Sequence, residues 1–126
     1  MDWRRNLLWI DCSGAALVGV VVVLLSGWLS ELHRLPQDFV LFMGWVNLGY
    51  GAYSFSLVRR AKRPLSLIRL LVAANLLWMV LCTYWTWLYF DQASIFGLLH
   101  VGGEGLYVGV LGWLEWRWRD LLLEKD

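Results

Sequence analysis

The chain has 126 residues, of which 60% are hydrophobic and 17% are charged, with 10 tryptophans and a formal net charge of +1. A soluble domain carries about 25% charged residues, and the apolar residues here form blocks too long for the strands of a soluble core. These values exclude an ordinary soluble domain, predict no nucleic-acid partner, and indicate an integral membrane protein whose first partner is the lipid bilayer.

Four apolar segments are long enough to cross the hydrocarbon core of a bilayer, which takes about 20 residues. They are residues 7–30, 39–58, 64–90 and 93–116. The connections between them are short, so consecutive helices must run antiparallel. The sequence therefore predicts an all-α fold in which residues 1–126 form a single transmembrane domain, an antiparallel four-helix transmembrane bundle.

The first segment carries an acidic residue, Asp11, close to its start. A charge at the bilayer centre costs roughly 2.5 to 3.5 kcal/mol on insertion scales, so Asp11 needs a polar partner inside the protein. The third segment offers Arg69 at a matching depth, because both residues lie about one helical turn inside the same end of the bundle. We expect a structural ion pair between Asp11 and Arg69, with Glu115 of the fourth segment near enough to share the arginine.

Three segments carry polar groups near mid-depth. Asn47 lies close to the middle of the second segment and shares a helix face with Tyr50. Asn75 lies close to the middle of the third segment, and Glu104 lies at the same depth in the fourth. Because lipid offers these groups no partner, we expect both amides to converge on Glu104 inside the bundle.

The fourth segment has a polar face along its whole length. At about 100° per residue, five side chains fall within a stripe roughly 80° wide, namely His100, Glu104, Tyr107, Leu111 and Glu115. His100 precedes Glu104 by four residues, a spacing at which two side chains can share a proton or a ligand. The alternative reading is a neutral, hydrogen-bonded Glu104 beside a core histidine.

Basic residues are concentrated at one end of the predicted bundle. That end has Arg4, Arg5, the RRAKR loop at 59–63, and three residues after the last segment, which are Arg117, Arg119 and Lys125. The other end has only Arg34. The positive-inside rule therefore places both termini in the cytoplasm.

Motifs of known enzymes, such as H-E-x-x-H or a phosphate-binding glycine loop, do not occur in the sequence. We predict no metal site, because zinc takes three or four ligands and only His100 and Glu104 stand together. The cofactor stays unassigned, with a haem held between His33 and His100 as a minor alternative. Cys12 and Cys82 lie at different depths, too far apart for a disulfide within one chain.

Four motifs resemble those of uncharacterised small four-span bacterial inner-membrane proteins. They are IDCSGAALVGV, NLGYGAYSFSL, AANLLW and GLLHVGGEGLYVGVLGWLEWRWRDLL. The likeness covers nearly the whole chain. It implies bacterial origin and residence in the inner (cytoplasmic) membrane as a multi-pass protein, and it carries over no activity or ligand.

Two functions fit these features. In the first, an intramembrane cavity binds or transports a small amphipathic or cationic molecule, with Glu104 as a proton-linked anchor and a lining of Asn47, Tyr50, Asn75, His100, Glu104 and Tyr107. In the second, the chain is a structural or accessory subunit of a larger membrane complex. One four-helix bundle has little room for a pathway, so we expect a homo-oligomer or a membrane complex. Enzyme activity is the least expected function.

Overall fold

The computed structural model describes residues 3–123, apart from the side chain of Arg5, and contains no strand in that range. Lys125, which we counted at the basic end, lies outside the described residues. The elements in chain order are η1 (Trp3–Asn6), α1 (Leu7–Leu24), α2 (Ser26–His33), α3 (Gln37–Val58), α4 (Leu65–Leu88), α5 (Ile95–Arg117) and α6 (Arg119–Leu122). The prediction of an all-α fold is confirmed.

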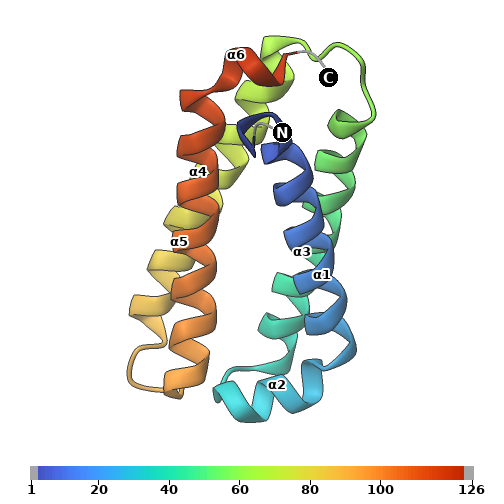
Figure 1. Ribbon diagram of the computed structural model, residues 1–126. Coiled ribbons are helices and arrows are strands. Elements are labelled where there is room, and N and C mark those ends of the chain that lie inside the picture. Colours follow the sequence, from blue (N-terminus) through green and yellow to red (C-terminus); the bar gives the residue numbers. More distant parts are fainter. Residues whose placement is uncertain (1–2, 124–126) are drawn as a thin grey trace.

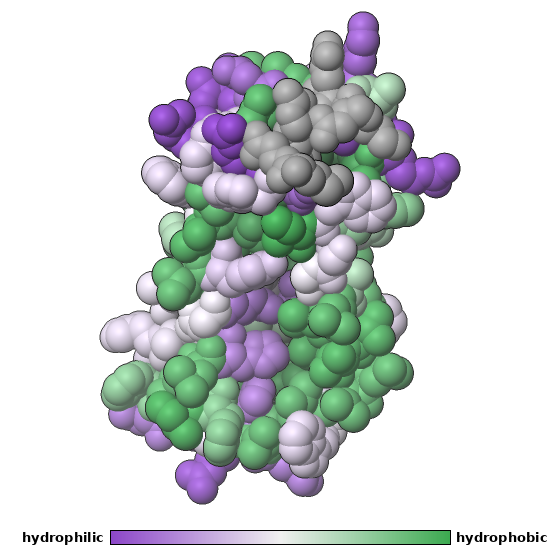
Figure 2. Space-filling model, viewed as in Figure 1, coloured by the Kyte–Doolittle hydropathy of each residue, from purple (hydrophilic) through white to green (hydrophobic). Residues whose placement is uncertain are grey.

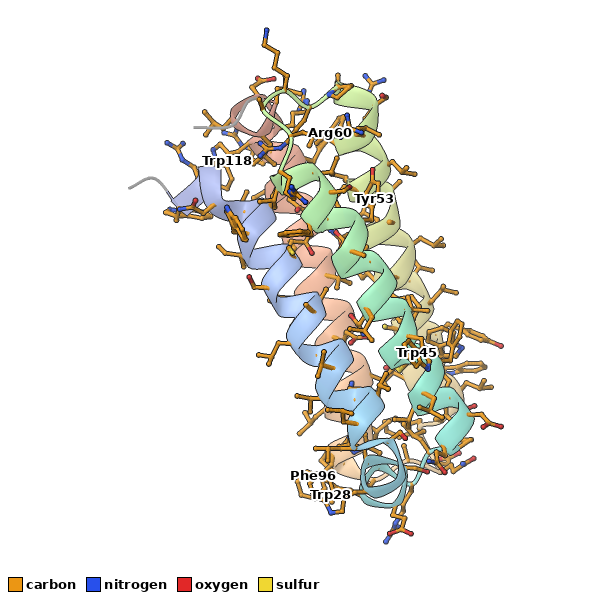
Figure 3. The ribbon with its side chains drawn as sticks, turned by 90° about the vertical axis from the view of Figure 1, so that its right-hand side faces the viewer. Trp28, Trp45, Tyr53, Arg60, Phe96 and Trp118 are labelled. Carbon is orange, nitrogen blue, oxygen red and sulfur yellow. The ribbon has the colours of Figure 1, made fainter. Side chains whose placement is uncertain are left out.

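The four long helices form two antiparallel pairs, with α1 packed along α3 and α4 packed along α5 (Figure 1). Contacts between the pairs are sparse and come mainly from α1 and α2 against α5. At the opposite end, α6 packs against η1, α4 and α5. Figure 3 shows Trp28 and Phe96 at one end of the molecule and Arg60 and Trp118 at the other. Helix contacts thus join the pairs at both ends of the bundle, in addition to the side-chain hydrogen bonds described below.

Three helices, α1, α4 and α5, are long and apolar enough to cross a membrane. α3 has a comparable length of 22 residues. Its asparagine, serines, tyrosines and glycines lower its mean hydropathy. By length and composition the structure thus supports three of the four predicted spans. The second predicted span, residues 39–58, stays a prediction.

The first predicted segment, residues 7–30, is wrong as a single helix. α1 ends at Leu24, and α2 turns across the end of the bundle (Figure 1). Ser26 and Gly27 follow the break, and Gly and Ser pairs are a recurrent cause of sharp helix kinks. The Ser26 side chain is buried and its hydroxyl accepts a hydrogen bond of 3.3 Å from Gln37 Nε2. This contact holds the start of α2 against the start of α3.

Glycines allow the two helices of each pair to approach closely. A Cβ atom placed on Gly19 of α1 would lie 2.9 Å from the backbone nitrogen of Leu48 in α3. A Cβ atom on Gly105 of α5 would lie 2.8 Å from Cβ of Cys82 in α4. Small residues at helix interfaces permit this approach in membranes. Close packing within each pair leaves space between the pairs.

Candidate functional site

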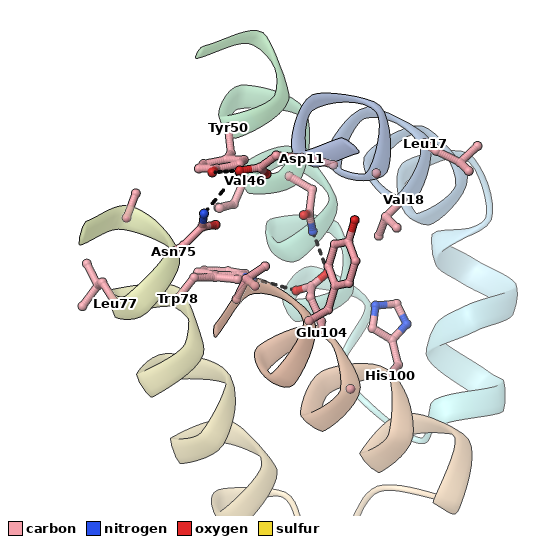
Figure 4. A pocket seen from close by; sticks show the side chains of 17 residues that line it. Asp11, Leu17, Val18, Val46, Tyr50, Asn75, Leu77, Trp78, His100 and Glu104 are labelled. Atoms are coloured by element: carbon pink, nitrogen blue, oxygen red, sulfur yellow. Dashed lines mark hydrogen bonds between the residues drawn. The ribbon is translucent and has the colours of Figure 1, made fainter. Parts of the chain in front are cut away.

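A cleft of about 620 Å³ lies between the two helix pairs. Figure 2 shows it as a hydrophilic hollow flanked by hydrophobic surface, and Figure 4 shows its side chains. α1, α3, α4 and α5 all contribute to its wall. The structure brings together all six side chains that we predicted as lining, which are Asn47, Tyr50, Asn75, His100, Glu104 and Tyr107.

Glu104 lies in the wall of this cleft, as the tenth of the 23 residues of α5. Its Oε1 accepts a hydrogen bond of 2.8 Å from Asn47 Nδ2 in α3. Its Oε2 accepts one of 2.8 Å from Trp78 Nε1 and lies 3.8 Å from Cys82 Sγ, both in α4. Glu104 therefore connects both helix pairs, and the expected contact between Asn47 and Glu104 is confirmed.

The expected contact between Asn75 and Glu104 is wrong. Asn75 Nδ2 donates instead to Glu115 Oε1 at 2.7 Å and to Asp11 Oδ2 at 3.3 Å. Trp78, three residues further along α4, takes its place beside Glu104. One feature of the sequence could have indicated the contact between Trp78 and Glu104. A tryptophan that is largely buried needs an acceptor for its indole N–H.

The expected ion pair between Asp11 and Arg69 is also wrong. Asp11 accepts a hydrogen bond of 2.6 Å from Tyr50 Oη in addition to the bond from Asn75. Arg69 is exposed, and within residues 3–123 it forms no ion pair with Asp11 or Glu115. Six residues separate Arg69 from Asn75, so the two side chains point about 120° apart around α4. Arg69 lies at the same depth as Asp11, but it lies on a face of α4 that is turned away from Asp11, so the two cannot pair.

Glu115 lies behind the cleft wall and is fully buried. Its Oε1 is bonded to Asn75, whereas its Oε2 has no hydrogen-bond partner in the described part of the chain. Together with Tyr50, these side chains form what we call the Asp11 cluster: Asp11, Tyr50, Asn75 and Glu115. One amide group thus bridges two buried carboxyl groups from α1 and α5.

Two histidines meet where α2 crosses α5. His33 is the last residue of α2, and its Nε2 lies 3.0 Å from Nδ1 of His100. Two metal bonds of about 2 Å on opposite sides of one ion would separate such nitrogens by about 4 Å, so this contact leaves no room for a haem iron. Burial lowers the pKa of His33, and the neighbouring His100 lowers that pKa further.

Tyr107 reaches from α5 across the cleft to α1. A Cβ atom placed on Gly14 would lie 2.7 Å from the Tyr107 hydroxyl.

Cys12 and Cys82 are buried free thiols. Residues 3–123 hold no cluster of three or more histidine, cysteine, aspartate or glutamate side chains that could bind a metal. The chemistry of the cleft therefore rests on its carboxyl groups, amides and aromatic rings.

The cleft is acidic and aromatic. Asp11 and Glu104 line it, and none of its described lining residues is a lysine or an arginine.

Comparison with protein families, with curated proteins and with solved structures gives no match. The residues of the cleft therefore carry the functional argument.

Proposed function

We propose that this chain is a four-span protein of the bacterial inner membrane with both termini in the cytoplasm, and that its cleft binds or transports a small amphipathic or cationic molecule. The observation that carries this proposal is the pair of acidic groups, Asp11 and Glu104, in a cleft whose described lining has two amides and a histidine but no lysine or arginine. Pockets that hold small molecules have volumes of about 300 to 1,000 Å³, a range that includes the roughly 620 Å³ found here.

The rim of the cleft suits a ligand that arrives from lipid. Leu17 on α1 and Leu77 on α4 both line it, and their side chains are 67% and 60% exposed. A molecule with an apolar body could pass between these side chains without losing contact with hydrocarbon. A positively charged group on that molecule would then meet the carboxyl groups inside, where low dielectric strengthens the attraction.

Glu104 is the proposed anchor. Asn47 and Trp78 give it neutral hydrogen bonds from two other helices, which fix the carboxyl group in position without supplying a counter-charge. A cation beside Glu104 would supply that charge. The ionised carboxylate attracts a cation and the protonated acid does not, so binding through Glu104 is linked to proton release.

A second candidate is a structural or accessory subunit of a larger membrane complex. The hydrogen bonds that both oxygens of Glu104 accept from protein groups favour it, because such bonds lock the two helix pairs together without a ligand. In this alternative, the exposed apolar and tryptophan-rich faces bind other subunits.

The experiment measures binding of the lipophilic cation tetraphenylphosphonium to the purified full chain in nanodiscs, beside the similarly shaped anion tetraphenylborate. The test variant is Glu104→Gln. Its matched control is Glu31→Gln, which removes an exposed acid outside the cleft. Both oxygens of Glu104 accept hydrogen bonds, so glutamine keeps both contacts only if the Asn47 amide flips. Unfolding curves for each variant must accompany the binding data.

We expect the cation to bind the wild-type chain and Glu31→Gln, and to bind Glu104→Gln at least about tenfold more weakly, a loss of about 1.4 kcal/mol. We also expect its affinity for the wild type to rise with pH. Equal binding of the cation and the anion, or equal cation binding by all three proteins, would overturn the proposal. No binding to the wild type would favour the accessory subunit.

A further inference from the structure

A second hollow of about 310 Å³ lies between α4 and α5 and shares no lining residue with the cleft. We call it the Arg69 groove. Small residues, Ala73 and Gly112, line it along with Val72, and two tryptophans, Trp113 and Trp116, contribute from α5. Its one charged lining residue in the described chain is Arg69.

Arg69 lies on the outer surface without an internal counter-ion. The side chain is exposed and has no ion pair or hydrogen bond within residues 3–123. It is the fifth residue of α4, so it lies about 6 Å along the helix from its start. An arginine on a lipid-facing surface at this depth extends its guanidinium toward the headgroup layer. An anion of that layer can pair with it there, because Asp11 and Glu115 are buried on the inner side of the helices.

The surroundings of the groove fit the interface of a bilayer. Trp113 and Trp116 are 60% and 39% exposed, and tryptophan is enriched at the headgroup level. Arg119 adds a second cation, since its Cζ lies 4.2 Å from the centre of the Trp116 ring. The small residues Ala73 and Gly112 leave an apolar channel along the groove. The groove therefore combines a cation at the interface with room for a hydrocarbon chain.

We propose that the Arg69 groove binds an anionic phospholipid. The guanidinium of Arg69 donates hydrogen bonds to the lipid phosphate, and an acyl chain lies along Ala73 and Gly112 between Trp113 and Trp116. Charge complementarity favours this occupant, because arginine pairs with phosphate through two parallel N–H donors.

This proposal requires α4 and α5 to lie in a bilayer, and it does not depend on what the cleft binds. The experiment counts lipids that stay bound to the purified full chain, by native mass spectrometry from micelles containing equal amounts of phosphatidylglycerol and phosphatidylcholine. The test variants are Arg69→Gln, which removes the cation, and Ala73→Phe, which fills the channel. The control is Arg60→Gln, because Arg60 is exposed in the loop before α4.

We expect wild type and Arg60→Gln to retain phosphatidylglycerol in preference to phosphatidylcholine. Arg69→Gln should lower this preference about tenfold, and Ala73→Phe should lower the retention of both lipids. Inorganic phosphate should not displace the bound lipid. The proposal is overturned if Arg69→Gln retains the preference, if free phosphate competes, or if the variants instead abolish a dimer seen by analytical ultracentrifugation. Circular dichroism should show that Arg69→Gln, a change on the surface, keeps the helices intact.

Discussion

His33 and His100 meet edge to face, with their ring centres 5.0 Å apart and a contact of 3.0 Å between Nε2 of His33 and Nδ1 of His100. A hydrogen bond between two imidazoles needs one nitrogen that accepts, so at least one ring must be neutral. Beside them, the backbone nitrogen of Ser94 donates to the His33 carbonyl at 2.9 Å. These contacts tie α2 to the start of α5 at one end of the bundle.

We predict that acid weakens this tie. Burial and the nearby His100 lower the pKa of His33 from the usual histidine value of about 6.5. Between that lowered pKa and about 6.5 the unfolded chain binds more protons than the folded chain, so stability is highest above this window and falls as pH decreases through it. Thermal unfolding in micelles should show a lower Tm at mildly acidic pH, with a smaller decrease in His33→Gln. Identical pH profiles would contradict the assignment to His33.

Asn75→Leu should be strongly destabilising. The substitution removes the donor to Glu115 and one of the two donors to Asp11, and a buried carboxyl group that loses its partner costs about 3 kcal/mol. Unfolding of the purified chain in micelles measures the loss. Gln92→Leu replaces an exposed amide and should change stability by less than about 0.5 kcal/mol. Similar losses in both variants would mean that the Asp11 cluster contributes little.

Gly19→Ala should separate α1 from α3. The added Cβ would lie 2.7 Å from Cγ and 2.9 Å from the backbone nitrogen of Leu48, and overpacking of this kind costs about 1 to 3 kcal/mol. Gly49→Ala is the matched control, because nothing lies within 4 Å of its added Cβ. Alanine there should be neutral or stabilise the helix by up to about 1 kcal/mol. Tm values of the two variants should therefore shift in opposite directions, or Gly19→Ala alone should decrease.

Arg63→Gln should disrupt the end of the bundle opposite the histidines. The buried Arg63 side chain donates to the carbonyls of Leu57, Val58 and Leu122 at 2.6, 3.1 and 2.9 Å. Glutamine cannot reach all three acceptors, so we expect a loss of roughly 2 to 4 kcal/mol. Arg60→Gln, an exposed change in the same loop, should have little effect. A chemical denaturation curve in micelles distinguishes the two.

The RRAKR loop, residues 59–63, shows what a pattern of basic residues can predict and what it cannot. Its basic residues share one signal for membrane orientation, and nothing in that signal distinguishes Arg63 from its neighbours. In the structure Arg63 alone of the four turns inward, while Arg59, Arg60 and Lys62 are exposed. The distinction depends on α6, which folds back to bring the Leu122 carbonyl within reach of Arg63.

The six side chains that we predicted from helical periodicity all line one cleft. The prediction succeeded because helical rise sets the depth of a residue and 3.6 residues per turn set its face. The partners of these polar groups were predicted correctly for Asn47 and Glu104 but not for Asp11 or Asn75. Depth matched Asp11 with Arg69 and Asn75 with Glu104, yet the rotation of α4 turns Arg69 outward and brings Trp78 to Glu104.

Helix content and the positions of polar groups along each helix were thus determined by the sequence, since both follow from local composition and spacing. The pairing of α1 with α3 and of α4 with α5, the break before α2 and the cleft between the pairs were decided by tertiary structure. The physical reason is that packing sets how each helix is rotated and how closely it approaches its neighbours. Those quantities depend on side chains from several helices at once.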